Sequence, residues 1–268
     1  MLENKTSLIT GSSQGIGLGI ARDFATHGAK VVLTSEHSRS KLSEEAEEVL
    51  RLNGTHYLQA DLSRDGEAER LVGEAWEKLK TIDVLVNNLG TFREPSFLNL
   101  TRGDFDRLMH INVWSAIAVT QAFVRRRIEE RRGGRILFTT SLNGTRSEPD
   151  HTLYDASKGA INALTRQLAI ELAPRGFTTA AVAPGLVETP LTDFGLRSDP
   201  EARQAIINQI PVRRIATVAD VTRWYAFLAS DAASYATGII IPVDGGLDAQ
   251  QMATRPTTEK ERIIKEGT

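Results

Sequence analysis

A glycine-rich turn near the start of the chain limits what this sequence can fold into. Gly11, Gly15 and Gly17 follow the apolar run 7–9 and precede residues 18–25, which have helical periodicity. Glycines at a strand-to-helix turn leave room for a phosphate, and the helix then points free N–H groups at the anion. The turn predicts a dinucleotide site, while its spacing alone is equally typical of a plain structural connection.

Composition is that of an ordinary globular domain. The 268 residues suffice for one large α/β domain, and 25% charged residues with a net charge of −2 favour neither a nucleic-acid nor a membrane-surface role. The sequence holds no cysteine, and its five histidines lack ligand spacing, so we expect no metal site. The chain reaches Gly11 without a signal-peptide pattern and has no membrane-length apolar run, so we expect a cytoplasmic protein.

Apolar runs alternate with helical patterns along the chain. Strands are predicted at 7–9, 30–34, 55–59, 82–86, 135–141, 178–183 and 238–246. Helices are predicted at 18–25, 41–52, 66–79 with Ser63 as a cap, 104–132, 154–172, 201–207 and 219–229. This alternation predicts an α/β, Rossmann-type doubly wound fold: a single domain over 1–246 whose mostly parallel sheet carries helices on both faces.

The longest helical pattern, 104–132, contains one polar residue on its apolar stripe. The stripe runs through Phe105, Leu108, Asn112, Ala116, Val119 and Phe123. A buried amide needs partners, so Asn112 is either a satisfied core residue or part of a site. The arginines at 125–127 and 131–132 are interpreted as a solvated helix end and not as a basic patch.

A tyrosine and a lysine lie one turn apart on the predicted helix 154–172. Tyr154 and Lys158 share one face of it, and an ammonium near a phenol lowers the phenol pKa from its usual value near 10. That would make Tyr154 an acid/base near neutral pH. Taken alone, the pair is more typical of an exposed helix face, and Ser141, at a strand exit, of a turn serine.

Together these motifs resemble the short-chain dehydrogenase/reductase family in its compact branch of about 250 residues. The resemblance covers about residues 5–246. It rests on Gly11, Gly15 and Gly17, Asn88-Leu89-Gly90, Asn112, Ser141, Tyr154 and Lys158, Pro184-Gly185, and Val243-Asp244-Gly245-Gly246. Leu89 departs from the alanine common in the family, which would alter packing over the adenosine half of a cofactor.

The resemblance implies a catalytic role for four residues. Tyr154 is the general acid/base, and Lys158 lowers its pKa and holds the nicotinamide ribose. Ser141 binds the substrate oxygen, and Asn112 bends its helix and holds a water linking Lys158 to solvent.

The resemblance also implies two sets of binding residues. Asp61 would contact adenine, Asn88 and Gly90 would line the cofactor, and Val187 and Thr189 would meet the carboxamide. The cofactor-binding residues are Gly11, Ser13, Gln14, Gly15, Ile16, Gly17, Ser35, Glu36, Asp61, Leu62, Asn88, Gly90, Tyr154, Lys158, Pro184, Gly185, Val187 and Thr189. The substrate residues are Ser141, Asn143, His151, Tyr154 and Phe194, with Phe92 at the border.

The implied function is that of an NAD(P)-dependent oxidoreductase that interconverts a secondary alcohol or a sugar hemiacetal with its carbonyl form. The alternative is a catalytically silent NAD(P)-binding regulator on the same fold. Residues 186–211 would cover the substrate, and their mixture of charged, polar and apolar side chains favours a small polyhydroxy or anionic substrate over a steroid.

The exit of the second predicted strand favours NAD, with NADP as the alternative. Ser35 stands where NAD-using relatives often carry aspartate, and Glu36 stands where phosphate-binding relatives often carry arginine. A carboxylate at Glu36 would repel a 2′-phosphate, unless His37 or Arg39 neutralises that phosphate.

The family resemblance further implies a homo-oligomer, with a tetramer favoured. Its interfaces would be the helices 104–132 and 154–172 and the sheet edge at 239–243. Residues 247–268 form a polar tail, interpreted as an inter-subunit arm or a disordered end.

Overall fold

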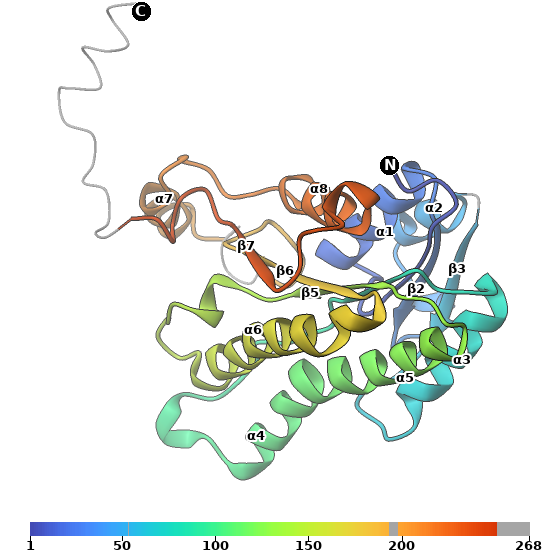
Figure 1. Cartoon of the computed structure of the whole chain (residues 1–268). Helices are drawn as coiled ribbons and strands as arrows, with labels where there is room; N and C mark the ends of the chain where they lie inside the picture. Colours follow the sequence, from blue (N-terminus) through green and yellow to red (C-terminus); the bar gives the residue numbers. More distant parts are fainter. Residues whose placement is uncertain (53, 193–197, 251–268) are drawn as a thin grey trace, which may run out of the picture.

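A single parallel sheet organises the chain in a computed structural model, which describes residues 1–52, 54–192 and 198–250 (Figure 1). Its strand order is β3-β2-β1-β4-β5-β6-β7, and every neighbouring pair is parallel. The strands are β1 Thr6–Ile9, β2 Lys30–Ser35, β3 Thr55–Gln59, β4 Val84–Asn87, β5 Arg135–Thr139, β6 Thr178–Pro184 and β7 Ile239–Val243. The predicted α/β architecture is confirmed.

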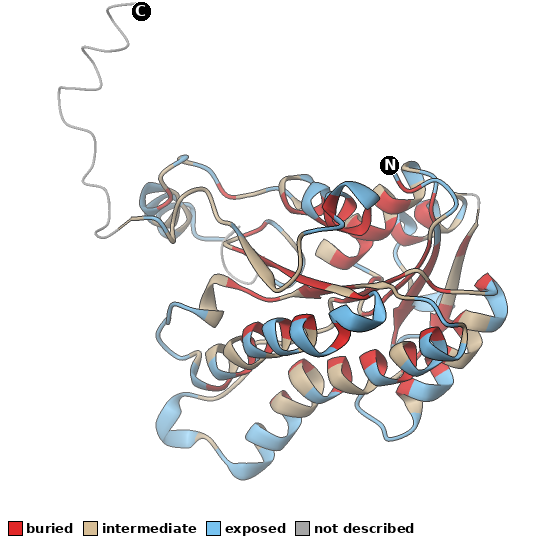
Figure 2. Cartoon of the chain, in the orientation of Figure 1, coloured by how far each residue is buried: buried red, intermediate tan, exposed pale blue. Residues whose placement is uncertain are grey.

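Helices cover both faces of this sheet (Figure 1). One face carries α1 Gly15–Thr26, α2 Glu44–Leu50 and α8 Val218–Ala229, and the other carries α3 Glu67–Leu79, α5 Ser115–Glu129 and α6 Thr152–Leu172. Buried residues line the sheet and the helix sides that face it (Figure 2). Each face has its own apolar core, with Phe24 in one and Phe123 in the other. The doubly wound arrangement is therefore confirmed.

The sheet order reverses at β1, which lies between β2 and β4. In doubly wound sheets ligands bind beyond the carboxyl ends of the strands at such a reversal. The glycine turn leaves β1 there, so the topology places it at the expected ligand position.

The prediction of one continuous α-helix over 104–132 is wrong. The segment is built from α4 Arg102–Met109, a π-helical turn at His110–Trp114 and α5. Asn112 sits inside the π turn, where the extra residue changes the helix direction. Phe105, which precedes the turn, is consequently exposed, whereas Leu108 and Phe123 are buried as predicted.

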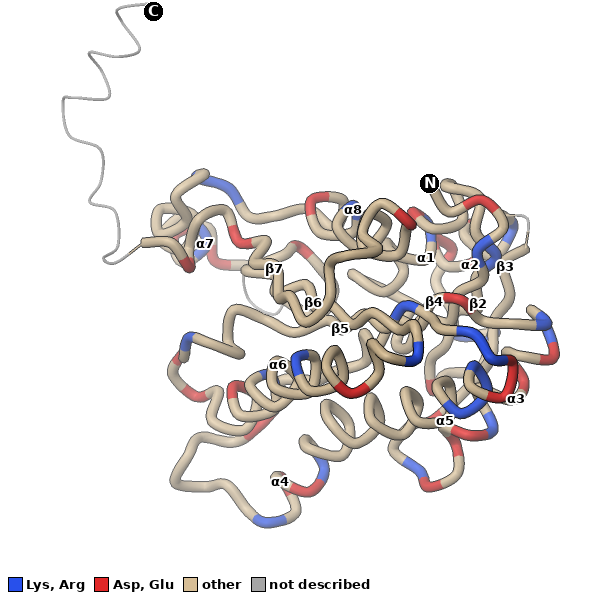
Figure 3. Tube along the Cα trace, in the orientation of Figure 1, with Lys and Arg blue, Asp and Glu red and all other residues tan. Residues whose placement is uncertain are grey.

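Two further expectations about helix ends are wrong. Ser63 does not cap α3, because its hydroxyl and its N–H both bond to the Asp61 carboxylate and the helix begins only at Glu67. Arg127 is buried instead of solvated, since it donates to the Gly133 carbonyl and pairs with Asp83. Elsewhere charges of both signs are spread over the helices and loops around the sheet (Figure 3).

After β6 the chain leaves the sheet and forms α7 Pro200–Gln209 and α8 before it returns to the sheet as β7. Helix α7 lies within the segment predicted to cover the substrate. After β7, Asp248 accepts a hydrogen bond of 2.8 Å from Arg146 Nε, which ties the start of the predicted tail to the loop after β5. Residues 251–268 lie outside the described part. No helix within the described residues is long and apolar enough to span a bilayer.

Candidate active site

A cavity of about 510 Å³ opens at the carboxyl ends of the strands. Every residue predicted to bind the cofactor lies in its wall, from Gly11 at the glycine turn to Thr189 after β6. Ser141, Tyr154 and Lys158 lie in the same wall, while Asn112 lies behind it. The fold thus brings segments from six strand exits to one cavity.

The glycine turn is held tightly against β4. Gly11 and Gly15 have φ of +60° and +56°, which favours glycine. A Cβ on Gly17 would lie 2.3 Å from the Gly11 carbonyl oxygen and 2.5 Å from Asn88 Nδ2. Asn88 Nδ2 donates to the carbonyl oxygen of Gly11 at 2.8 Å, and its Oδ1 accepts from the Thr139 hydroxyl at 3.0 Å. Asn88 therefore ties the turn to the neighbouring strands.

The first turn of α1 suits an anion. Its N-cap, Gln14, makes no side-chain cap hydrogen bond, and no acidic residue lies in this first turn. The first N–H groups of a helix have no intrahelical partner and carry the positive end of the dipole. With Gly15 and Gly17 admitting close approach, these residues fit the diphosphate of a dinucleotide.

Tyr154 and Lys158 both project from α6 into the cavity wall. The ammonium of Lys158 lies 5.5 Å from the centroid of the Tyr154 ring and donates to the Thr139 carbonyl oxygen at 3.0 Å. The Ser141 hydroxyl, which donates to Asn143 Oδ1 at 3.1 Å, lies in the same wall as the Tyr154 phenol. The three side chains thus form one contiguous polar group at the exit of β5.

Burial governs the ionisation of both α6 residues. It raises the pKa of Tyr154, against the smaller lowering effect of the Ser141 hydroxyl. It lowers the pKa of Lys158 to about 8. The prediction that Lys158 lowers the pKa of Tyr154 is therefore wrong for the chain by itself, because desolvation outweighs the other contributions. At neutral pH Tyr154 is a phenol, which is a proton donor.

Both polar atoms of the Asn112 amide have protein partners. Its Oδ1 accepts from the N–H of Thr91, and its Nδ2 donates to the Thr91 carbonyl, both at 2.8 Å, and to Ser157 Oγ at 2.9 Å. A Cβ on Gly90 would lie 3.4 Å from both Asn112 Oδ1 and Lys158 Nζ. Asn112 thus clamps the loop after β4 beside the buried lysine.

Comparison with known proteins agrees with this geometry. A family model described as enoyl-(acyl carrier protein) reductase matches residues 11–248. Oxidoreductase UcpA of Salmonella typhimurium is 38% identical over 256 residues, which are 91% of this chain and 95% of that protein. The chain is a short-chain dehydrogenase/reductase. It is accordingly an NAD(P)-dependent oxidoreductase.

Two other members are similar over almost their whole length. L-rhamnose 1-dehydrogenase (NAD(P)+) of Azotobacter vinelandii is 36% identical, with 92% of this chain and 98% of that protein covered. A crystal structure from Beutenbergia cavernae, described as a candidate NAD(P)-dependent gluconate 5-dehydrogenase with bound NADP at low occupancy, is 34% identical. It has a TM-score of 0.85 and covers 93% of this chain and 98% of that one.

Only some of the residues predicted to bind the substrate face the cavity of this short-chain dehydrogenase/reductase. Ser141 and Tyr154 face the cavity, whereas Asn143 and His151 do not. Asn143 Oδ1 accepts a hydrogen bond from Ser141 Oγ at 3.1 Å, and Asn143 Nδ2 donates to Asp155 Oδ1 at 2.8 Å. The His151 ring packs at a tilt against both the Phe92 ring and the Tyr154 ring, with centroids 5.8 and 5.7 Å away, so it supports the tyrosine from outside the cavity. Phe194 lies outside the described residues.

Several residues of the cavity wall were not predicted from the sequence. Thr91, Ile111, Thr140, Pro190, Leu191 and Thr192 are among them. Leu191 and Thr192 lie within the segment predicted to cover the substrate, so that prediction could have identified them as wall residues. Ile111 lies in the π turn, where the family resemblance already implied a helix bend at Asn112 but not which neighbour would line the cavity. Leu89 packs against Gly11, whose Cβ would lie 3.2 Å from its Cδ1.

Proposed function

We propose that this oxidoreductase interconverts a secondary alcohol or a sugar hemiacetal with its carbonyl form, with Tyr154 as general acid/base. The observation that carries the proposal is the presence of Ser141, Tyr154 and Lys158 in the wall that also contains the glycine turn. One cavity can therefore hold the cofactor and the reacting oxygen together.

Each residue has a distinct part in the proposed reaction. When bound, the nicotinamide cofactor supplies the hydride chemistry. The Tyr154 phenol donates its proton to the carbonyl oxygen during reduction and accepts it back during oxidation. Ser141 donates a hydrogen bond to the same oxygen, and Lys158 holds the nicotinamide ribose hydroxyls. Asn112 holds the loop after β4 beside Lys158 and is proposed to hold the water that connects the lysine to solvent.

A panel of substrates distinguishes the proposed enzyme from the alternative, a catalytically silent cofactor-binding protein. Polyols, aldoses, hydroxy acids and steroids are offered with NAD(H) and NADP(H), and absorbance is followed at 340 nm. A protein-dependent change with any of them supports an enzyme, whereas tight cofactor binding without turnover on every class favours the silent regulator. We propose a small polyhydroxy substrate, because the relatives from Azotobacter vinelandii and Beutenbergia cavernae are described as acting on rhamnose and gluconate.

We further propose NAD as the preferred cofactor. Glu36 lies in the cavity wall. Arg39 does not lie there, because its guanidinium makes two hydrogen bonds to the Glu47 carboxylate, at 3.0 and 2.9 Å. His37 remains, and its ring lies 3.4 Å from the Glu36 carboxylate. At 4 Å a carboxylate and a phosphate repel by up to about 4 kcal/mol at an effective dielectric constant near 20, less with salt.

Glu36→Arg should move the preference toward NADP. The substitution replaces a repulsive carboxylate with a guanidinium that pairs with phosphate. We expect the kcat/KM ratio of NADP to NAD to rise at least about tenfold, which corresponds to about 1.4 kcal/mol. Glu48→Arg on α2 makes the same charge change outside the cavity wall and should leave the ratio unchanged. A higher wild-type kcat/KM with NADP(H) than with NAD(H) would refute the proposed preference.

The protein is proposed to act as a cytoplasmic homo-oligomer, with a tetramer favoured. Large apolar side chains are exposed on α4, on the π turn and on α6, including Phe105, Trp114 and Ile170, and β7 is an edge strand of the described sheet. Exposed apolar faces and open edges mark association surfaces. Light scattering at micromolar concentration should give four times the chain mass, and a monomeric mass would contradict the oligomer.

A further inference from the structure

Helix α6 carries Tyr154 and Lys158 but does not cap its own N-terminus. Its N-cap residue, His151, makes no side-chain cap hydrogen bond. Asp155 in the first turn is also engaged elsewhere, since its carboxylate accepts from Asn143 Nδ2 at 2.8 Å and from the Glu148 N–H at 3.3 Å. The first N–H groups of a helix need acceptors, and a helix end inside the fold is costly without them.

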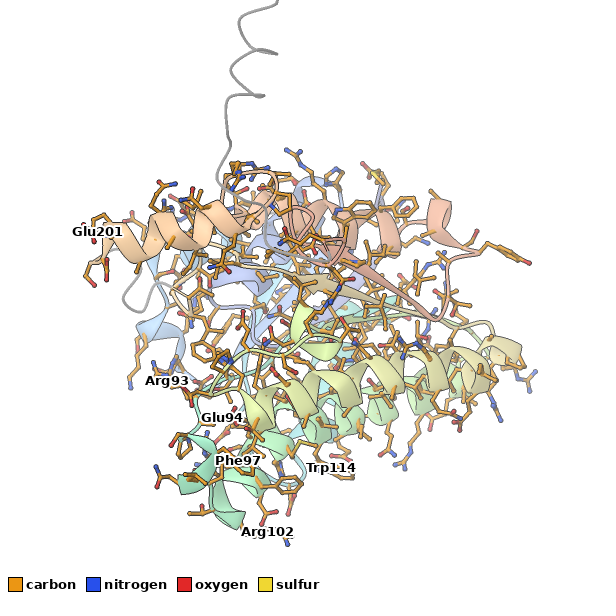
Figure 4. All side chains as sticks on the ribbon, turned by 90° about the vertical axis from the view of Figure 1, so that its left-hand side faces the viewer. Arg93, Glu94, Phe97, Arg102, Trp114 and Glu201 are labelled. Atoms are coloured by element: carbon orange, nitrogen blue, oxygen red, sulfur yellow. The ribbon has the colours of Figure 1, made fainter. Side chains whose placement is uncertain are left out.

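Glu94, from the loop after β4, supplies the missing cap. Its Oε2 accepts from the N–H of Leu153 at 2.8 Å and its Oε1 from the N–H of Tyr154 at 3.5 Å. Glu94 lies beside the first turn of α6 in Figure 4. The carboxylate therefore takes the place of an N-cap side chain and satisfies the N–H of the proposed acid/base itself.

The loop that presents Glu94 is anchored along its length. At Thr91 the Asn112 amide makes two hydrogen bonds to its backbone, both at 2.8 Å. At Arg93 the backbone carbonyl accepts from Arg107 on α4 at 2.9 Å. Between these points the Phe92 ring meets the Tyr154 ring edge-on, with centroids 6.3 Å apart. Residues 91–94 thus connect the π turn to the backbone and the ring of Tyr154.

We propose that Glu94 is a positioning residue, which sets the place of Tyr154 relative to Ser141 by fixing the first turn of α6. The inference rests on the proposed function, because it concerns the geometry of the proposed acid/base. Without the carboxylate the first turn frays, and the phenol no longer meets the substrate oxygen in one fixed orientation. Misplacement by about 1 Å is enough to slow a reaction by about a hundredfold.

The test compares Glu94→Ala and Glu94→Gln with a capping control. Ser43 caps α2, whose residues contribute nothing to the cavity wall, by accepting from the Ala46 N–H at 3.2 Å. Ser43→Ala therefore removes a helix cap away from the site. Three quantities are measured in the full chain: kcat, the cofactor dissociation constant by fluorescence, and hydrogen exchange of peptides containing the first turn of α6.

We expect Glu94→Ala to lower kcat about tenfold and to speed exchange at the first turn of α6, with the cofactor dissociation constant changed less than twofold. Glu94→Gln should restore most of kcat, since an amide oxygen accepts the same N–H groups. Ser43→Ala should leave all three quantities unchanged. Faster exchange with wild-type kcat in Glu94→Ala would overturn the positioning role, and so would unchanged exchange. A wild-type protein without turnover on the panel would overturn the proposed function first, and this inference with it.

Discussion

Tyr154→Phe should lower turnover by about 10²–10⁴-fold, the range typical of losing a general acid/base. The substitution keeps the ring that packs against Phe92 and His151 and removes only the hydroxyl. Cofactor affinity should therefore change little, so the loss falls on kcat. The measurement is steady-state kinetics on the best substrate of the panel, with cofactor binding followed by fluorescence.

A second buried tyrosine provides the control. Tyr225 is fully buried and its hydroxyl lies 2.6 Å from the Thr139 hydroxyl, but it is outside the cavity wall. Tyr225→Phe should cost about 1 kcal/mol of stability and leave most of the turnover. Near-normal turnover in Tyr154→Phe on the true substrate would show that the proposed proton transfer does not pass through this phenol.

Lys158→Met should lower activity strongly and at the same time stabilise the protein. Burial lowers the pKa of Lys158 from 10.5 to about 8, which corresponds to about 3 kcal/mol of penalty for holding the ammonium inside. An apolar side chain of similar length removes that penalty but also the hydrogen bond to Thr139. We expect the unfolding free energy at pH 7 to rise by about 1–3 kcal/mol. We expect kcat/KM to fall at least about 10²-fold, since the side chain that is proposed to hold the ribose, and that lies over the Tyr154 ring, is lost.

The pH dependence gives a second readout of the same substitution. The pKa of Lys158 is lower in the folded than in the unfolded chain, so the unfolded chain binds more protons above pH 8. The contribution of Lys158 to stability is therefore unfavourable below pH 8 and becomes less so as the pH rises toward 10.5. Burial raises the pKa of Tyr154, which acts in the opposite direction only above about pH 10.

Urea unfolding between pH 7 and 10 therefore measures the effect. The advantage of Lys158→Met over the wild type should shrink as the pH rises from 8 to 10. Lys78→Met, at an exposed position of α3, should change the unfolding free energy by less than about 0.5 kcal/mol at every pH. A destabilised Lys158→Met protein at pH 7 would show that the buried ammonium contributes net stability, contrary to this account.

The sequence by itself determined the architecture and a large part of the cavity wall, including the glycine turn, Ser141 and Tyr154. Strands such as 30–34 were predictable because a parallel strand buried on both faces is an apolar run, and alternation with helices then leaves few topologies. The glycine turn, Ser141 and Tyr154 were predictable because each stands at a strand exit or at the start of the following helix, and such sites converge in this fold. Backbone topology therefore carried the local motifs to one place.

Only the tertiary structure decided how these residues are held and ionised. The π turn at His110–Trp114, the burial that raises the pKa of Tyr154 and the cap from Glu94 all depend on contacts between segments distant in the chain. No periodicity predicts them, because a carboxylate 59 residues before Leu153 has no sequence relation to the helix that it caps. Desolvation likewise depends on the packing of the whole fold, which is why a pairwise argument from Lys158 predicted the wrong direction for the pKa of Tyr154.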